Sequence, residues 1–232
     1  MQKIGVIGGL SWVSTAEYYK RLNQLMQDRL GGVSSARLVL ESVNRQAYVD
    51  AVVELQDEQA ACNQILEAAR AVERAGADFV VISCNDVHRF VPEIAPNLAI
   101  PFLHIAEATA DAIGAQGLRK VALLGVRKTM EGDFYPDIFA RRGIETLVPN
   151  ESERAFVHDS IYDELVLDVF TDETRRGYQK IIRDLGMRGA EGVVLGCTEI
   201  PLLLRPDQIL IPSFSTTELH CAAAVEQAVS EA

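Results

Sequence analysis

Residues 76–84 read GADFVVISC, and residues 189–197 read GAEGVVLGC. Each segment is a short apolar run of the kind that forms a strand buried on both faces of a parallel sheet, and each ends at a cysteine, Cys84 or Cys197. Two further pairs of segments match in the same order: Lys3-Ile4-Gly5-Val6-Ile7-Gly8 with Lys120-Val121-Ala122-Leu123-Leu124-Gly125, and Ile100-Pro101 with Ile211-Pro212. Three matches in one order indicate that the chain contains one fold twice.

Strand-like runs alternate with helical periodicity along the whole chain, which is typical of βαβ units. In the first half we expect strands at residues 3–8, 37–43, 78–83 and 99–103, a helix opened by a capping box at 14–17 and closed at 31–32, and a second helix at 57–75. The predicted fold class is α/β. It consists of two similar lobes, each with a mostly parallel sheet flanked by helices, which are related by a pseudo-twofold axis.

The repeat also predicts the domain organisation. No linker rich in Pro, Gly or Ser separates the two halves, so we expect the lobes to pack directly. The last segment is helical by composition over residues 218–229 and is expected to cover the first lobe. We therefore predict a first lobe of residues 1–103 plus 213–232 and a second lobe of residues 104–212.

Composition disfavours several classes of function. The formal net charge of −11 and the absence of a basic stripe oppose binding to nucleic acid. No run approaches the roughly 18 consecutive apolar residues that a membrane span needs, and the first residues do not form a signal peptide, so we expect a cytoplasmic protein. The four cysteines form no C-x-x-C pair and no zinc-type cluster, so we expect free thiols and no metal site.

The two matched cysteines are the candidates for chemistry. Ligands of parallel α/β sheets bind beyond the carboxyl ends of the strands, where Cys84 and Cys197 lie. If the lobes face each other, the two thiols approach one cleft from opposite sides. Inverting a stereocentre by proton transfer needs a base on one face and an acid on the other, and a thiolate and a thiol can exchange these roles.

The sequence leaves the charge state of these thiols open. The start of a helix after each cysteine favours a thiolate, whereas Asp86 and Glu199, each two residues after a cysteine, oppose it if they point inward. A lone buried cysteine is more often a small hydrophobic residue than a catalyst. This alternative is the one we expect for Cys62 and Cys221, which have no equivalent in the other half.

Taken together, these motifs resemble those of the aspartate/glutamate racemase family over essentially the whole chain. The matching pieces are Gly8-Gly9-Leu10-Ser11-Trp12 with Ser14-Thr15, Ser42-Val43-Asn44, Cys84-Asn85-Asp86-Val87-His88, Gly125 with Thr129-Met130-Glu131, and Gly196-Cys197-Thr198-Glu199-Ile200. The resemblance implies Rossmann-like lobes, a homodimer and a racemase of small amino acids that uses neither pyridoxal phosphate nor a metal.

The resemblance also implies roles for individual residues. Cys84 and Cys197 look like the catalytic pair. The expected substrate-binding residues are Asn85 and Thr198, which would hold the α-carboxylate, and Ser11, Asn44 and Thr129, which would line the pocket. Each of the last three also has a structural alternative, since Ser and Thr cap helices and Asn forms turns. His88 could tune the thiol or lie on the surface of a helix.

Departures from the family pattern concern the substrate. Asp86 stands where the family commonly has Thr, Leu167-Asp168 lies where aspartate-specific members offer a basic residue, and Ser215 replaces a common Asp. An acidic substrate side chain needs a cationic or hydrogen-bonding partner. Arg45 and Arg127 could supply it, although both could equally face solvent. Racemisation is therefore a firmer expectation than specificity for aspartate.

Other functions are also compatible with these residues. Related two-lobed enzymes racemise hydantoins, isomerise maleate or decarboxylate arylmalonates. From a different class, the chain could be a non-catalytic small-molecule binding protein. A nucleotide-dependent oxidoreductase is less well supported, because residues 5–9 do not read G-x-G-x-x-G and only Glu41 is available as a ribose-binding acid.

Overall fold

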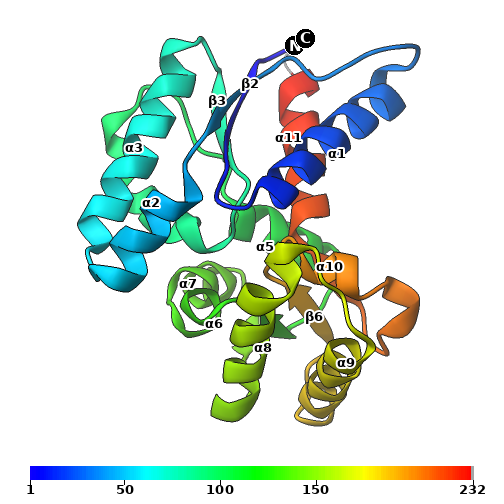
Figure 1. Cartoon of the computed structure of the whole chain (residues 1–232). Helices are drawn as coiled ribbons and strands as arrows, with labels where there is room; N and C mark the ends of the chain where they lie inside the picture. The colour runs from blue at the N-terminus through cyan, green and yellow to red at the C-terminus, as the bar shows by residue number, and fades with distance from the viewer. Residues whose placement is uncertain (231–232) are drawn as a thin grey trace. The chain divides into compact units, whose positions relative to one another are not determined.

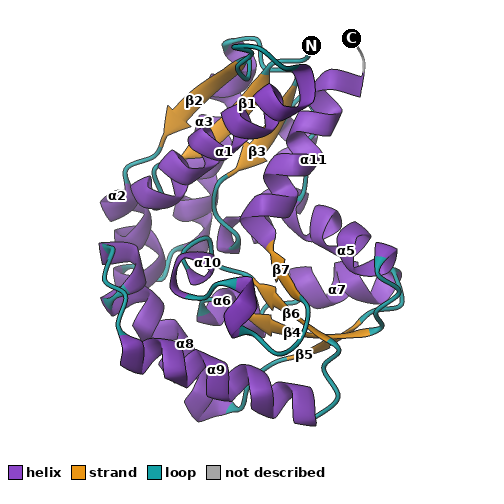
Figure 2. Cartoon of the chain, turned by 90° about the vertical axis from the view of Figure 1, so that its right-hand side faces the viewer, coloured by secondary structure: helices purple, strands orange, loops and turns teal. Residues whose placement is uncertain are grey.

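The computed structural model describes residues 1–230, which form two compact units. Each unit is a parallel β-sheet with helices packed on both of its faces (Figures 1 and 2). Unit 1 consists of Met1–His104 together with the C-terminal segment from His220, and unit 2 consists of Ile105–Leu219. The predicted α/β class with two parallel sheets is confirmed.

Unit 1 contains a three-stranded sheet in the order β2-β1-β3. Its core has two layers: Ile7, Val80 and Ile82 face α3, whereas Ile4 and Val6 face α1 and α11. The strands are β1 (Ile4–Gly8), β2 (Leu38–Ser42) and β3 (Phe79–Ile82), and the helical segments are α1 (Trp12–Leu30), α2 (Arg45–Val49), the π-helix η1 (Asp50–Glu54), α3 (Glu58–Arg74), η2 (Asp86–Phe90), α4 (Val91–Ile94), η3 (Ala95–Asn97) and α11 (Thr216–Ser230).

Unit 2 contains a four-stranded sheet in the order β5-β4-β6-β7. Ala122 and Val193 face the layer of α8 and α9, while Val121 and Val194 face α5 and α7. The strands are β4 (Lys120–Leu124), β5 (Glu145–Leu147), β6 (Gly192–Leu195) and β7 (Ser213–Ser215), and the helical segments are α5 (Ile105–Ala115), α6 (Arg127–Glu131), α7 (Phe134–Arg141), α8 (Glu151–Asp163), η4 (Leu165–Leu167), α9 (Asp172–Met187), α10 (Ile200–Leu203) and η5 (Pro206–Gln208).

The sequence repeat is also a repeat of strand register. In unit 1, Ile4 pairs with Phe79, and the offsets of the matched segments carry this pair onto Val121 and Gly192, which pair in unit 2. The same holds at the end of each half, where the bridge Val80–Phe102 corresponds to the pair Val193–Ser213. Cys84 and Cys197 therefore follow equivalent strands at equivalent heights.

The strand expected at residues 99–103 is reduced to a single bridge at Phe102. Two backbone hydrogen bonds make this bridge, one from Val80 N–H to the carbonyl of Pro101 and one from Leu103 N–H to the carbonyl of Val80. The equivalent Pro212 of unit 2 accepts in the same way from the N–H of Val193, so the missing N–H of proline does not explain the difference. The equivalent segment of unit 2 is longer and forms β7.

The capping box expected at residues 14–17 is wrong. Helix α1 begins earlier, at Trp12, because Ser11 is its N-cap and accepts a hydrogen bond of 3.3 Å from the backbone N–H of Ser14. Ser14 and Thr15 are therefore buried residues of the first turn. At the other end α1 stops at Leu30 and Gly31 is the C-cap, as the glycine pair predicted.

The chain returns to unit 1 at His220, later than the predicted boundary at residue 213. Residues 213–219 belong to unit 2, because β7 pairs in parallel with β6 and Thr216, the first residue of α11, donates a hydrogen bond to the carbonyl of Leu195. The later part of α11 buries Cys221, Ala224 and Val225 against the core of unit 1. Across residues 1–230, no helix combines the length and the apolar character that crossing a bilayer would take.

Candidate active site

The residues predicted for the first half gather at one edge of the sheet of unit 1. Cys84 follows β3 and is half-buried, and Ser83 extends the pairing because its N–H donates to the carbonyl of Ile7. Ser11 follows β1 and Asn44 follows β2. All three strands are parallel, so their carboxyl ends lie at the same edge, where ligands of such sheets bind.

In unit 2, two predicted residues are brought together by a close approach of the backbone. A Cβ atom added to Gly196 would lie 2.7 Å from the carbonyl oxygen of Leu124 and 3.2 Å from the methyl carbon of Thr129. Only glycine fits there, and the approach seats Cys197 next to the segment that carries Thr129. Thr129 is fully buried, and its hydroxyl has no hydrogen-bond partner within the described residues.

Cys197 is directly coupled to a buried carboxylate. Its thiol donates a hydrogen bond of 2.9 Å to Oε2 of Glu199, and the hydroxyl of Thr198 donates to the same oxygen at 2.7 Å. Glu199 is only 2% exposed and Thr198 is buried as well. Glu199 therefore points at the sulfur of Cys197, the orientation in which it opposes formation of a thiolate.

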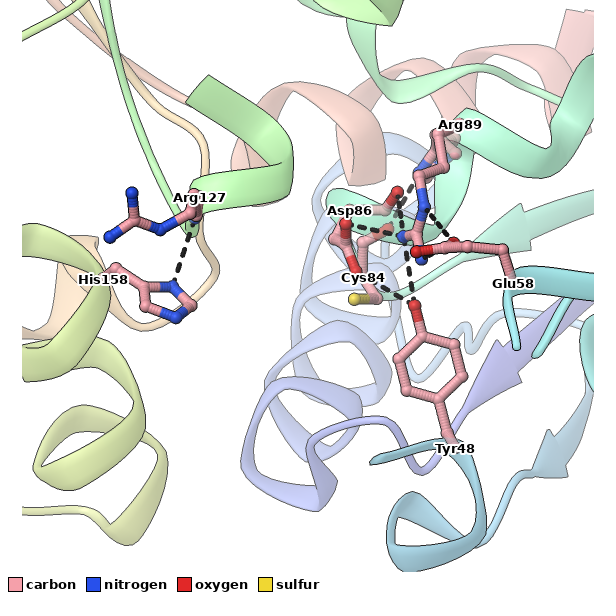
Figure 3. A network of polar contacts seen from close by, with 8 residues as sticks. Tyr48, Glu58, Cys84, Asp86, Arg89, Arg127 and His158 are labelled. Atoms are coloured by element: carbon pink, nitrogen blue, oxygen red, sulfur yellow. Dashed lines mark hydrogen bonds and ion pairs between the residues drawn. The ribbon is translucent and has the colours of Figure 1, made fainter. Parts of the chain in front are cut away.

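The equivalent acid in unit 1 has different partners. Asp86 forms an ion pair of 2.6 Å with the guanidinium of Arg89 and accepts a hydrogen bond of 3.0 Å from the hydroxyl of Tyr48 (Figure 3). The same guanidinium donates to the Tyr48 hydroxyl and, at 2.7 Å, to Glu58. Asp86 thus belongs to a network that neutralises its charge close to Cys84.

Burial and charge act together in this network. Burial, followed by the neighbouring Asp86 carboxylate, raises the pKa of Tyr48 far above its usual value, so the phenol stays protonated and remains a donor. Burial alone would lower the pKa of Arg89, but the charges of Asp86 and its other partners raise it, so the guanidinium stays charged. Arg89, Tyr48 and Glu58 were not predicted from the sequence. Only the spacing of three residues between Asp86 and Arg89 could have indicated that these two side chains pair.

His88 is not a surface residue. It is fully buried, and its Nδ1 lies 2.8 Å from the carbonyl oxygen of Cys84. A carbonyl oxygen only accepts, so Nδ1 carries the proton and Nε2 is the unprotonated ring nitrogen. Nε2 has no hydrogen-bond partner among residues 1–230. Burial, with further contributions from His104 and His220, lowers the pKa of His88 well below its ordinary value, so the ring is neutral. Its role is to hold the backbone at Cys84.

Two of the remaining candidates act as helix caps. Ser11 caps α1, and Asn44, which is exposed, caps α2 by accepting from the N–H of Gln46 at 3.0 Å. Thr129 is not a cap, because α6 begins after Val126. Asn85 is buried and lies just before the short helix η2. These roles fix the local backbone and leave binding by the same residues open to experiment.

The residues considered for substrate specificity lie in varied settings. Arg127 is partly exposed and pairs with Glu131 at 3.3 Å, while its backbone N–H donates to His158 (Figure 3). Leu167 is 65% exposed. Ser215 accepts a hydrogen bond from the N–H of Glu218. None of these contacts presents a buried guanidinium or ammonium group for an acidic side chain.

The other two cysteines are buried. Burial, followed by the carboxylate of Glu93, raises the pKa of Cys62 to about 11, which keeps this thiol protonated. Cys221 lies on α11 and packs into the core of unit 1. Within the part of the chain that the structure describes, no group of three or more His, Cys, Asp or Glu side chains is arranged to hold a metal ion.

Comparison with known proteins adds independent evidence. The Asp/Glu/Hydantoin racemase family model matches residues 7–224. The chain is 22% identical to the broad specificity amino-acid racemase RacX of Bacillus subtilis, over 90% of each protein. It is also 28% identical to glutamate racemase of Thermus thermophilus, over 69% of the chain and 60% of that enzyme.

Solved structures agree with this result. A Yersinia pestis protein classed by name with the Asp/Glu racemases is 37% identical and superimposes with a TM-score of 0.91, covering 99% of this chain and 100% of that one. An aspartate racemase homologue from Pyrococcus horikoshii is 30% identical, with a TM-score of 0.84 and coverage of 98% and 99%. The chain therefore belongs to the Asp/Glu/hydantoin racemase family and is an enzyme of the isomerase class.

Proposed function

We propose that this protein is a cofactor-independent amino-acid racemase in which Cys84 and Cys197 act on opposite faces of the substrate Cα. The observation that carries the proposal is the equivalence of the two cysteines. Each is half-buried and follows the matching strand of one repeat, at the edge of the sheet where ligands bind. Packing alone does not explain a thiol kept at both positions.

The proposed reaction balances in protons. One sulfur, as a thiolate, removes the Cα proton and becomes a thiol, and the electron pair is delocalised onto the substrate carboxylate. The other sulfur, as a thiol, delivers its proton to the opposite face and becomes a thiolate. The enantiomer is released, and the two cysteines have exchanged roles.

The remaining predicted residues would bind the substrate. Asn85 and Thr198, which follow the two cysteines directly, are proposed to hold the α-carboxylate with nearby backbone amides. Ser11, Asn44 and Thr129 are proposed to line the pocket. The buried, unsatisfied hydroxyl of Thr129 supports this role, because such a group is costly unless it gains a partner.

For the side chain of the substrate we propose a broad preference rather than strict use of aspartate or glutamate. The guanidinium nearest to Cys84 in the chain, that of Arg89, is already paired with Asp86 and Glu58. Arg127 is paired with Glu131. At either of these two guanidinium groups a second substrate carboxylate would have to displace an existing partner, and the relative from Bacillus subtilis carries the name of a broad specificity enzyme.

A racemase of hydantoins is the second candidate, since the matching family model includes hydantoin racemases by name. As in the family, we also propose a homodimer located in the cytoplasm. A non-catalytic binding protein of similar architecture would keep its affinity for ligand after both cysteines are replaced.

The test is a chiral assay of the purified protein without pyridoxal phosphate against single L- and D-amino acids and 5-substituted hydantoins. We expect interconversion of several amino acids, with deuterium entering Cα in heavy water, and loss of the interconversion in Cys84→Ser and in Cys197→Ser. Turnover of hydantoins alone would favour the second candidate. Ligand binding without any exchange, unchanged in the serine variants, would refute a racemase.

A further inference from the structure

The two repeats differ in the partners of their equivalent carboxylates. Asp86 and Glu199 each stand two residues after a candidate cysteine, at matching positions. The carboxylate of Glu199 accepts a hydrogen bond from the thiol of Cys197 itself. That of Asp86 is held by a guanidinium and a phenol instead.

The contact in unit 2 ties a proton to the sulfur. A carboxylate can only accept, so the 2.9 Å contact between Sγ of Cys197 and Oε2 of Glu199 requires the proton to lie on sulfur while Glu199 is charged. Removing that proton would place two negative charges side by side at a site where Glu199 is 2% exposed. Like charges in such a setting strongly disfavour the ionised form.

The contacts in unit 1 have the opposite effect. Arg89 and Asp86 form a pair whose side chains are 15% and 11% exposed, and Tyr48 donates to the second oxygen of the same carboxylate. The guanidinium of Arg89 and the phenol of Tyr48 offset the charge of Asp86, while Glu58, which shares this guanidinium, is 41% exposed to solvent. A thiolate at Cys84 therefore meets a carboxylate that is paired with other groups, whereas a thiolate at Cys197 would lie in direct contact with the carboxylate that now accepts its proton.

We infer that the two cysteines rest in different protonation states, with Glu199 holding the proton on Cys197 as the resting acid and Cys84 serving as the resting base. This inference rests on the proposed racemase function. Glu199 is a positioning residue in this scheme, since it acts through Cys197. The Asp86–Arg89–Tyr48 network is what keeps the equivalent carboxylate from doing the same to Cys84.

The asymmetry has a consequence for turnover. One enantiomer is deprotonated by the resting state directly, and each such turnover leaves a thiol at Cys84 and a thiolate at Cys197. A proton must then return from Cys84 to Cys197 through solvent, and Glu199 makes this return favourable. Because the two enantiomers are equally stable, kcat/KM must be equal in both directions, so the asymmetry is best measured on the free cysteines.

The experiment is alkylation of the substrate-free protein with iodoacetamide across a pH series, followed by mass spectrometry of the peptides that carry Cys84 and Cys197. The thiolate is the reacting species, so the pH midpoint of each reaction reports where that thiol ionises. In the parent protein we expect Cys84 to have the lower midpoint. In Glu199→Gln we expect the midpoint of Cys197 to fall by about one pH unit, about a tenfold change in thiolate population, with Cys84 unchanged.

Two further variants are a control and a second test. The control is Glu145→Gln, which removes an exposed carboxylate of the edge strand β5 that pairs with Lys120 and should leave both midpoints unchanged. Thr198→Val removes the hydroxyl that shares the charge of Glu199, and should raise the midpoint of Cys197. Thr198→Val keeps the inference testable if Glu199→Gln does not fold.

The inference is overturned if Cys197 ionises at or below the pH of Cys84 in the parent, or if its midpoint does not move in the Glu199 and Thr198 variants. These measurements use no substrate and are separate from the chiral assay. Expected midpoints without any racemisation would therefore overturn the proposed function and leave the thiol assignment standing.

Discussion

Replacing Arg89 by methionine tests whether the network beside Cys84 is a compensated charge cluster. The change removes the guanidinium from Asp86, from the Tyr48 hydroxyl and from Glu58, while the methionine stem can still pack on Phe90, which lies under the guanidinium at 4.1 Å. We expect the free energy of unfolding to fall and the folded protein to keep its secondary structure.

The magnitude follows from burial. The side chains of Arg89 and Asp86 are 15% and 11% exposed, and breaking a pair this deep by removing one partner costs about 3–5 kcal/mol. The contact with Glu58, which is 41% exposed, adds at most about 1 kcal/mol. Asp86 keeps the Tyr48 hydrogen bond and some exposure, so we expect a loss of about 3 kcal/mol, at the lower end of the range for buried pairs.

The assay is urea denaturation at pH 7 of the parent, Arg89→Met, Asp86→Asn and the double variant. The double variant should be more stable than Arg89→Met alone, because it no longer buries an unpaired carboxylate, with a coupling energy of about 2 kcal/mol between the two positions. A loss below about 1 kcal/mol for Arg89→Met, or strictly additive effects, would show that Arg89 and Asp86 are not a strongly coupled buried pair.

Three further outcomes are expected from the same measurement of unfolding. Burial lowers the pKa of His220 from 6.5 to about 4, so the unfolded state binds this proton more tightly, and His220 contributes a loss of stability of about 3 kcal/mol as the pH drops from about 6.5 to about 4. His220→Gln should remove this contribution and make the pH dependence less steep, and an unchanged slope would contradict it. Gly196→Ala should destabilise by about 1–3 kcal/mol, because its Cβ would lie 2.7 Å from the carbonyl of Leu124, and a neutral effect would speak against the close approach. Ser11→Ala should cost about 1 kcal/mol, because α1 loses its N-cap. Ser14→Ala should remove no cap, whereas a capping box at residues 14–17 would make it the more destabilising of the two changes.

The fold could be predicted well from the sequence because its signal is periodic and repeated. The matched segments carry strand pairing in the same register in both halves, so residues 3–8 and 120–125 could be identified as equivalent strands from their amino acids alone. The prediction failed where one local group decides the outcome. Ser11 rather than Ser14 caps α1, and the pairing at Phe102 does not continue into a strand as the equivalent pairing does in β7.

The site was predicted less completely, for a physical reason. The positions of Cys84 and Cys197 follow from the ends of the strands, which the repeat marks. The partners of Asp86 do not, since Tyr48 lies 38 residues away and is brought to it only by the tertiary fold, in which Tyr48 packs in the same core cluster as residues of α3. Whether Glu199 points at a sulfur or away from it depends on a side-chain rotamer, and no sequence pattern specifies that.

Proton exchange between the two cysteines and the substrate Cα can be followed as deuterium exchange at Cα in heavy water without added pyridoxal phosphate. Starting from a single enantiomer, we expect the parent protein to incorporate deuterium as it forms the opposite enantiomer, and we expect neither Cys84→Ser nor Cys197→Ser to racemise its substrate. Racemisation that continues at the parent rate after either replacement would contradict this expectation.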